Sequence, residues 1–447
     1  MSTVQRYLEA AVEAHRAGNT KDAEETYQKI LNMDPTNPTV LYLLGDINVR
    51  RGFNGLAINL LTNSIQHEPR QEAYVTLGCA LKNEFFIDEA RQAWEKALTF
   101  GESDEVFNNL SALYADSGQS EKALPLCNKA LQHNPDNPHA HWNKALALLT
   151  AGAWASGWDE HEWRMQKEIK KSISPRSYGV PRWEGQPGAR VVVHGEQGVG
   201  DEVMFLSCLP DVVHRSREVI VECEPRLMDL VERSFPGVRA YATEEALKAH
   251  EQGYEYAIPM GSIPRLFRRA HRAFPHHTGY LKPSFARIQH WREQFAAAGP
   301  GPHIGLAWIG GTKTTRVHQR TIEPENFAFL KEHGTVISLQ YGQFAEAGAR
   351  RGGFVWFDES NGQNLDEQAA MVMACDVVVT VCQTLVHLAG ALGKETWVLT
   401  PKFSSWRYGR TDRMPWYPSV QLFRQTIADK WDAPLKAVET KATGRFK

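Results

Sequence analysis

Residues 376–400 read DVVVTVCQTLVHLAGALGKETWVLT, and this stretch decides how the second half of the chain folds. Its β-branched run VVVTV is typical of a strand buried on both faces of a parallel sheet. Thr384 is then placed to cap a helix that Gly393 ends, and ETWVLT forms the next strand. Because the turn before such a helix points free N–H groups beyond the sheet, we predict a phosphate site there.

The same alternation of strand-like and helix-like segments is found on both sides of this stretch, and it begins at Arg190. The strand-like runs are RVVVHGE, EVIVEC, VRAYA, YEYAIPM, HIGLAWIG, GTVISLQ, GFVWFDE, DVVVTV, TWVLT and QLFRQ. A break between Pro283 and Pro302 divides them into two sets. We therefore predict two parallel-sheet domains, 189–295 and 296–447, that face each other across a cleft and bind ligands beyond the carboxyl ends of their strands.

Residues 1–152 form a repeat. Small residues recur at spacings of 34, 33 and 33, and a large or apolar residue follows each by one helical turn. The small positions are Ala23, Ala57, Ala90 and Ala123, and the following ones are Tyr27, Leu61, Trp94 and Cys127. This pattern resembles the tetratricopeptide repeat, which implies an all-α solenoid that serves as a scaffold or binds a partner. Asn109 and Asn143 lie 34 residues apart and are candidates for binding an extended peptide.

Residues 153–188 depart from the repeat. The segment AWASGWDEHEWRMQ combines Trp154, Trp158 and Trp163 with charged residues such as Arg164, which predicts an amphipathic capping helix whose tryptophans form interface core. The stretch KKSISPRSYGVPRWEGQPG that follows has the composition of a linker.

Composition narrows the functional classes. The 447 residues are 42% hydrophobic with a formal net charge of −2, which gives no support to non-specific nucleic-acid binding. The six cysteines form no CxxC pair, so buried thiols fit better than disulfides or zinc. The first residues do not form a signal peptide and no apolar run has the length of a membrane span. We expect a cytoplasmic protein.

Three polar stretches follow predicted strands. The turn GEQGVGDEVMF, residues 195–205, offers Asp201, either as an N-cap or as a general base. The stretch 304–323 ends a strand in two glycines and then presents hydroxyls and cations, among which Thr312 and Arg320 suit a diphosphate. The stretch 404–425 interleaves aromatics with arginines, which fits packing or nucleic-acid binding.

Taken together, EQGVGD, IGLAWIGG, VISLQYG, the 376–400 stretch and WRYG with MPWYPSVQLFRQ resemble glycosyltransferase family 9, the heptosyltransferase-like proteins, over residues 158–425. The resemblance implies the two-domain GT-B fold and inverting sugar transfer from a nucleotide donor without a metal or other cofactor. The chain also has no DxD motif. Where many members carry an aspartate, this chain has Cys382, so the donor sugar stays open.

The resemblance also implies site residues by position. Asp201 matches the catalytic base, and an acceptor-side loop comprises Glu196, Gln197, Gly198 and Gly200. The donor-binding residues are Gly311, Thr312, Arg320, Gln340, Gln383, Thr384, His387, Leu388, Ala389 and Gly390.

The sequence thus predicts a solenoid followed by a GT-B pair of Rossmann-like domains that transfers a sugar from a nucleoside diphosphate to an acceptor hydroxyl. Asp201 would take the proton, while Arg320 and His387 offset the charge of the leaving diphosphate. The repeats would recruit an acceptor protein, glycan or nucleic acid. The alternatives are a non-catalytic adaptor with a degenerate ligand-binding portion, and a transferase acting on hydroxylated nucleic acid.

Overall fold

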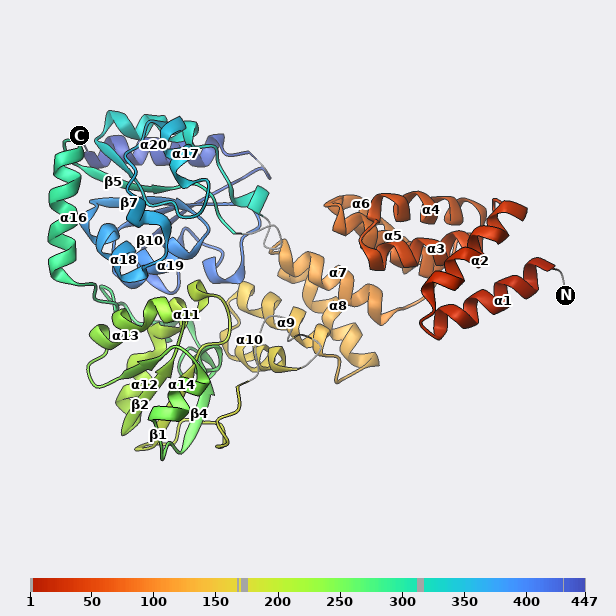
Figure 1. The fold of residues 1–447 in the computed structure, drawn as a ribbon, viewed down its shortest axis with the longest axis horizontal. Coiled ribbons are helices and arrows are strands. Elements are labelled where there is room, and N and C mark those ends of the chain that lie inside the picture. Colours follow the sequence, from red (N-terminus) through yellow and green to blue (C-terminus); the bar gives the residue numbers. More distant parts are fainter. Residues whose placement is uncertain (1–2, 167–168, 170–175, 312–316, 429, 447) are drawn as a thin grey trace. The chain divides into compact units, whose positions relative to one another are not determined.

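The computed structural model describes most of the chain (Figure 1). The described residues are 3–166, 169, 176–311, 317–428 and 430–446. They form two compact units, each considered below by itself. The first comprises Met1–Tyr114 and Glu121–Asn143, and the second comprises Ala115–Ser120 and Lys144–Lys447.

The amino-terminal part is a series of helical hairpins, as the repeat predicts. Its helices are α1 (Thr3–Arg16), α2 (Thr20–Met33), α3 (Pro38–Arg51), α4 (Asn54–His67), α5 (Gln71–Asn83), α6 (Ile87–Ala97), α7 (Asp104–Asp116), α8 (Ser120–His133), α9 (Pro138–Ala151) and α10 (Trp154–His161). Glycine occupies the turn of four hairpins in the left-handed conformation, with φ between 66° and 86°. The four are Gly18, Gly52, Gly118 and Gly152.

The repeat arises because small residues on one helix of a hairpin receive large residues of the other. A Cβ at Gly45 would lie 2.6 Å from Leu61 Cγ, and one at Gly78 would lie 2.3 Å from Trp94 Nε1. Leu61 and Trp94 are both fully buried. The glycine is therefore needed for close packing of the two helices.

Asn109 and Asn143 do not form the predicted pair of side chains for binding an extended peptide. Asn143 is buried and its Nδ2 donates to Asn108 O (3.1 Å) and Ser111 Oγ (3.2 Å), so its amide is used in packing neighbouring hairpins. Asn109 Nδ2 donates to Cys79 Sγ at 3.7 Å. The prediction failed for Asn143 because helix position alone does not distinguish an inward from an outward side chain.

The first sheet is parallel throughout, with strand order β3-β2-β1-β4. Its strands are β1 (Arg190–His194), β2 (Glu218–Glu222), β3 (Arg239–Tyr241) and β4 (Tyr256–Pro259). The helices of this domain are α11 (Val199–Phe205), α12 (Leu209–Arg215), α13 (Met228–Ser234), α14 (Glu244–His250) and α15 (Ile263–Phe267). The segment EVMFLSCLPDVVHR is divided between α11 and α12, and Pro210 lies in the first turn of α12.

The second sheet has the order β6-β5-β7-β8-β10-β9 and is parallel except for β9. Its strands are β5 (His303–Ala307), β6 (Thr335–Ser338), β7 (Val377–Val381), β8 (Thr396–Thr400), β9 (Arg413–Met414) and β10 (Tyr417–Arg424). GFVWFDE was wrongly predicted as a strand. Only Val355 pairs, as a single bridge to Ile337, because the backbone turns at Gly353 with φ +67°.

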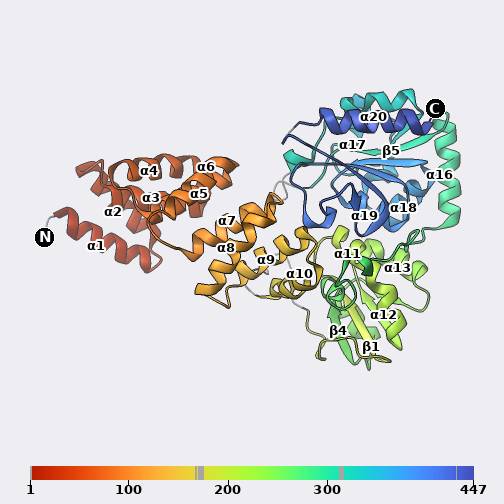
Figure 2. The ribbon, with the colours of Figure 1, turned by 180° about the vertical axis from the view of Figure 1, so that it is seen from behind.

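Two layers of helices cover the faces of the second sheet. The helices are α16 (Phe285–Ala298), α17 (Ala345–Gly352), α18 (Leu365–Ala374), α19 (Thr384–Ala391) and α20 (Asp432–Phe446). Val377, Val379 and Val381 pack in one buried cluster with residues of α17 and α20, whereas Val378 packs in the other with α18 and α19. All five residues of β7 are therefore buried, as the β-branched run predicts. Figure 2 shows α17 and α20 together on one side of this sheet.

The predicted capping segment is present as α10 and a 3-10 turn, η1 (Glu162–Met165). Trp154 and Trp158 are buried, and Trp158 Nε1 donates to Arg268 O (3.0 Å). This confirms that these tryptophans are packing residues. Arg164 does not lie on a polar face as the amphipathic pattern suggests, because its side chain is fully buried.

Candidate functional site

The turn GEQGVGD joins the carboxyl end of β1 to the first turn of α11. Gly198 occupies the N-cap position, and Asp201 N donates to Gly198 O at 2.8 Å. Asp201 is therefore inside the helix and is not its N-cap. Its side chain is 19% exposed, which leaves the carboxylate partly accessible at the carboxyl edge of the first sheet.

An arginine from the second sheet domain binds this carboxylate. Arg407, in the 3-10 turn η11 (Trp406–Tyr408), donates from Nε to Asp201 Oδ1 and from Nη2 to Gln197 Oε1 (3.3 Å). Its Nη1 donates to Ser405 Oγ (2.9 Å). The guanidinium thus joins the predicted acceptor-side loop to the carboxy-terminal domain, and we call this contact the 201–407 clamp. Sequence reasoning placed Arg407 in an arginine-rich stretch and gave no signal for the pairing.

The start of α19 lies directly against the same loop. A Cβ at Gly200 would lie 3.4 Å from both His387 Cδ2 and Thr384 Oγ1. Residues predicted for the two sides of the cleft, Gly200 on one and Thr384 and His387 on the other, are therefore brought together. A side chain longer than alanine at position 200 would have to displace α19.

His387 is a buried, neutral histidine. Its Nδ1 lies 3.2 Å from Tyr417 Oη, and burial lowers the pKa of His387 to about 4, with Arg407 adding to the shift and Asp201 opposing it. An imidazole with this pKa is uncharged at neutral pH, so it cannot offset diphosphate charge as a cation. The prediction that His387 offsets the charge of the diphosphate is therefore wrong. His387 is an uncharged side chain that packs in the core.

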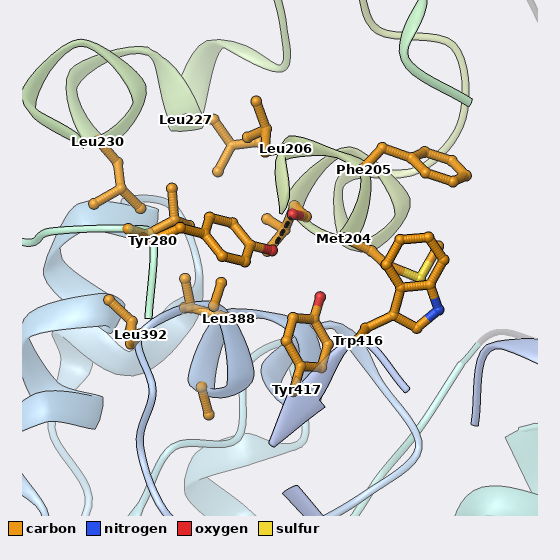
Figure 3. Packing of buried hydrophobic residues seen from close by; sticks show 14 of the residues in the cluster. Met204, Phe205, Leu206, Leu227, Leu230, Tyr280, Leu388, Leu392, Trp416 and Tyr417 are labelled. Carbon is orange, nitrogen blue, oxygen red and sulfur yellow. Dashed lines mark hydrogen bonds between the residues drawn. The ribbon is translucent and has the colours of Figure 1, made fainter. Parts of the chain in front are cut away.

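The rest of α19 is core, and the donor-contact prediction is wrong for Leu388, Ala389 and Gly390. Figure 3 shows Leu388 packing in a cluster with Tyr280, Met204 and Tyr417. Leu388 and Ala389 are fully buried, and a Cβ at Gly390 would lie 2.3 Å from the Tyr417 ring. Gly390 therefore admits Tyr417 and not a ligand. The physical reason is that α19 is enclosed by its own sheet and by α11.

The turn before α19 differs from the predicted cap. The helix begins at Thr384, and Gln383 is at the N-cap position without a side-chain capping bond. Thr384 is therefore not the N-cap. The amide Nε2 of Gln383 donates to Thr380 Oγ1 (3.1 Å), while its Oε1 is buried and has no hydrogen-bond partner among the described residues.

More buried polar atoms without described partners lie along the carboxyl edge of this sheet. They are Ser338 Oγ at the end of β6, Thr400 Oγ1 at the end of β8 and Gln425 Nε2 just after β10. Gln383, Thr400 and Gln425 lie at the carboxyl ends of β7, β8 and β10, which are neighbours in the sheet, and each is at most 6% exposed. A buried polar atom without a partner costs free energy, so these atoms mark the carboxyl edge of the sheet as the place where its polar side chains gather.

The end of β5 is shaped by close backbone packing. A Cβ at Gly310 would lie 2.3 Å from Cys382 O and 3.1 Å from Arg320 O, and Gly311 has φ +80°. Arg320 ends the 3-10 turn η8 (Val317–Arg320) and lies near Cys382, where its charge opposes the burial that raises the pKa of the thiol to about 12. Thr312 lies outside the residues that the structure describes.

Two predicted contact residues are used inside the protein. Gln340 Oε1 accepts from the backbone N–H groups of Trp308 (3.0 Å) and Ile309 (2.8 Å), so it holds the end of β5. Glu196 accepts from Arg164 at 2.8 and 3.0 Å, and both side chains are buried. Neither side chain has the ligand-facing position that the resemblance implies, because each compensates buried donors.

Arg424 and the tryptophans of the stretch 404–425 are used inside the fold. Arg424 donates to Tyr408 O (2.8 Å) and Gly409 O (2.9 Å), and Trp406 and Trp416 are buried. Trp406 packs edge-on against Trp158, with ring centroids 5.4 Å apart. The stretch therefore packs the carboxy-terminal domain and positions Arg407, while Arg410 and Arg413 lie on the surface.

A surface cavity of about 790 Å³ lies elsewhere, beside α16 and α18. Its lining includes Arg287, His290, Trp291 and Glu367, and none of the predicted site residues. In the described part of the chain, no group of three or more His, Cys, Asp or Glu side chains is placed to hold a metal ion.

Comparisons with known proteins support the amino-terminal repeats. Residues 109–157 match the family model described as tetratricopeptide repeat. The chain contains tetratricopeptide repeats. Protein FlbA of Caulobacter vibrioides is 31% identical over 369 residues, which cover 75% of this chain. The chain spans 61% of the length of that relative.

Solved structures match less than two fifths of the chain. The MamA protein is 24% identical, with 38% of this chain and 93% of that chain covered and a TM-score of 0.33. PilF of Pseudomonas aeruginosa is 19% identical, with 37% of this chain and 77% of that chain covered and a TM-score of 0.33. Within the described residues, no helix is both long and apolar enough to cross a membrane.

Proposed function

We propose that the chain is a glycosyltransferase of the GT-B type that moves a sugar from a nucleotide donor to an acceptor hydroxyl. The observation that carries the proposal is the meeting of Asp201, at the carboxyl edge of the first sheet, with Arg407 and the start of α19 at the carboxyl edge of the second. Ligands of parallel sheets bind at these edges. The repeats would recruit the acceptor or a partner.

In this proposal, different side chains carry out proton transfer and the stabilisation of negative charge. An Asp201 carboxylate oxygen takes the proton of the acceptor hydroxyl, whose oxygen forms the bond to the anomeric carbon. The bond from that carbon to the phosphate oxygen breaks, and the electron pair leaves with the nucleotide. Arg407 and Arg320 supply positive charge for the phosphate groups, and Gln383 supplies an acceptor for a donor hydroxyl.

In this scheme Arg407 exchanges partners. The 201–407 clamp occupies Asp201 Oδ1 in the structure, so Arg407 must turn from the carboxylate to the donor phosphates before Asp201 can act as a base. Donor binding would thus release the base, which prevents proton abstraction before the donor is present.

The experiment is the release of free nucleotide, measured by mass spectrometry, from a panel of sugar nucleotides incubated with the full chain. We expect one donor to be hydrolysed or transferred, and Asp201→Asn to abolish the release. The matched control is Asp229→Asn, an exposed aspartate in the first turn of α13 in the same domain, which should leave release unchanged. Nucleotide release that survives Asp201→Asn would refute the proposal.

A second candidate is the non-catalytic adaptor, which the 201–407 clamp favours because the carboxylate is already neutralised by a guanidinium. In that case calorimetry would detect nucleotide binding with no release from any donor, and Asp201→Asn would leave partner binding by the repeats unchanged.

A further inference from the structure

Arg164, in η1, is fully buried, and all three nitrogens of its guanidinium donate hydrogen bonds. Nε and Nη2 donate to Oε1 (3.0 Å) and Oε2 (2.8 Å) of Glu196. Nη2 also donates to Ser262 Oγ (2.8 Å), and Nη1 donates to His161 O (3.1 Å) and Glu162 Oε1 (3.2 Å). One arginine therefore joins the capping segment, the loop after β1 and the turn after β4, which leaves the Glu196 carboxylate little freedom to move.

Glu196 in turn fixes the side chain of its neighbour Gln197. Gln197 Nε2 donates to Glu196 Oε1 (3.3 Å), and Gln197 Oε1 accepts from Arg407 Nη2 (3.3 Å). A carboxylate only accepts hydrogen bonds, and a guanidinium only donates them. The amide of Gln197 therefore satisfies both partners in one orientation, with its NH2 group toward Glu196 and its oxygen toward Arg407.

These contacts form a continuous series that ends at Asp201. Arg407 Nε donates to Asp201 Oδ1, so Gln197 and Asp201 bind the same guanidinium through different nitrogens. We call the series Arg164, Glu196, Gln197, Arg407 and Asp201 the 164–201 relay. The first two side chains are 0% and 2% exposed, whereas those of Arg407 and Asp201 are 23% and 19% exposed. The relay is thus anchored in the core, and the end that must move lies at the candidate site.

The contacts of Gln197 distinguish a positioning role from a ligand contact. The resemblance implies that Gln197 lies on the acceptor side of the site, but its amide has a protein partner at each end. Its bond to Arg407 must break when Arg407 turns from Asp201 to the donor phosphates. Removal of this bond therefore lowers the free-energy cost of that turn and leaves the base and the phosphate-binding arginines in place.

We propose that Gln197 is a positioning residue that holds Arg407 on Asp201 until a nucleotide binds, with Glu196 and Arg164 fixing its amide. The inference rests on the proposed function, because it specifies what controls the release of Asp201 as a base. It also gives the buried Arg164 a role beyond packing, since this side chain links the segment that follows the repeats to the candidate site.

The reaction of arginine side chains with phenylglyoxal measures the hold on Arg407 without requiring activity. Mass spectrometry of the peptide that contains Arg407 gives its rate of modification in the full chain. We expect Gln197→Leu to raise this rate by about twofold to fivefold, the effect of losing one partly exposed hydrogen bond. Gln252→Leu is the matched control, because it removes the hydrogen bond of an exposed glutamine to Lys248 O in the same domain. The exposed Arg413 should react at one rate in all variants.

Calorimetry with UDP, ADP, GDP and CDP gives a second readout. For the nucleotide that the wild type binds most tightly, we expect Gln197→Leu to raise the affinity by about twofold to fivefold, because Arg407 is released more easily. A merely structural role predicts the opposite change, since a disordered loop would disturb the site. An unchanged rate of Arg407 modification, or a lowered nucleotide affinity, would overturn the inference. If none of these nucleotides binds, the proposed function fails, and the modification rate alone decides whether Gln197 holds Arg407.

Discussion

The 201–407 clamp gives the sharpest energetic prediction. Asp201 and Arg407 are 19% and 23% exposed, so their ion pair lies between the surface pairs worth about 0.2–1 kcal/mol and the buried pairs whose disruption costs about 3–5 kcal/mol. We expect Asp201→Asn and Arg407→Gln each to destabilise the protein by about 1–2 kcal/mol, since each leaves one partly buried group without its partner. The double variant should lose less than the sum.

Urea unfolding of the wild type, both single variants and the double variant forms the thermodynamic cycle. Tryptophan fluorescence is a suitable signal because the buried Trp406 directly precedes Arg407 in the chain. The coupling energy should be about 1 kcal/mol and should fall as salt is added. A coupling energy below about 0.3 kcal/mol would refute the clamp, because values of that size are found between residues that do not interact.

Three further predictions concern packing and titration. Gly78→Ala should destabilise the chain by about 1–3 kcal/mol in thermal unfolding, because the added Cβ meets the Trp94 ring. Arg164→Met should cost about 3–5 kcal/mol in urea unfolding, because it leaves Glu196 as a buried carboxylate without its partner. The pKa of His387 is lowered from 6.5 to about 4, so the unfolded chain binds the proton more readily and stability should fall by about 3 kcal/mol between pH 6.5 and 4. The variant His387→Asn should remove most of that loss in denaturation measured across this pH range.

Matched variants define what would contradict these predictions. Gly55→Ala, on an exposed surface of α4 with no atom near the added Cβ, should not destabilise the chain, and equal losses at Gly55 and Gly78 would refute the packing argument. Arg269→Met breaks an exposed pair with Asp159 and should cost about 1 kcal/mol or less. An unchanged pH dependence in His387→Asn would show that other groups cause it.

Sequence patterns predicted the features that depend on local spacing. The run VVVTV indicated β7 because burial on both faces requires apolar residues at consecutive positions. The recurring alanines and the large residues that follow them by one turn indicated the helical hairpins, since helix packing repeats with the period of the chain. The turn from β1 to α11 was found because strand, glycines and helix are adjacent in sequence.

Contacts between distant residues were not predictable from spacing. Arg407 and Asp201 are separated by 206 positions, and Arg164 and Glu196 by 32, so each residue alone has the appearance of a solvated charge. The burial of α19 did have a signal, because TLVHLAGA has apolar residues around the whole helix, and such helices lie in the core.

The central claim is that Asp201 acts as the base in a sugar transfer. The most direct test is to compare wild type and Asp201→Asn for single-turnover consumption of the active donor and, by calorimetry, for nucleotide affinity. A general base predicts a rate loss of about 10²–10⁴-fold, with nucleotide affinity unchanged or raised by up to about fivefold because the carboxylate no longer holds Arg407. A variant that consumes donor at the wild-type rate, or that loses rate only in proportion to affinity, would contradict the account.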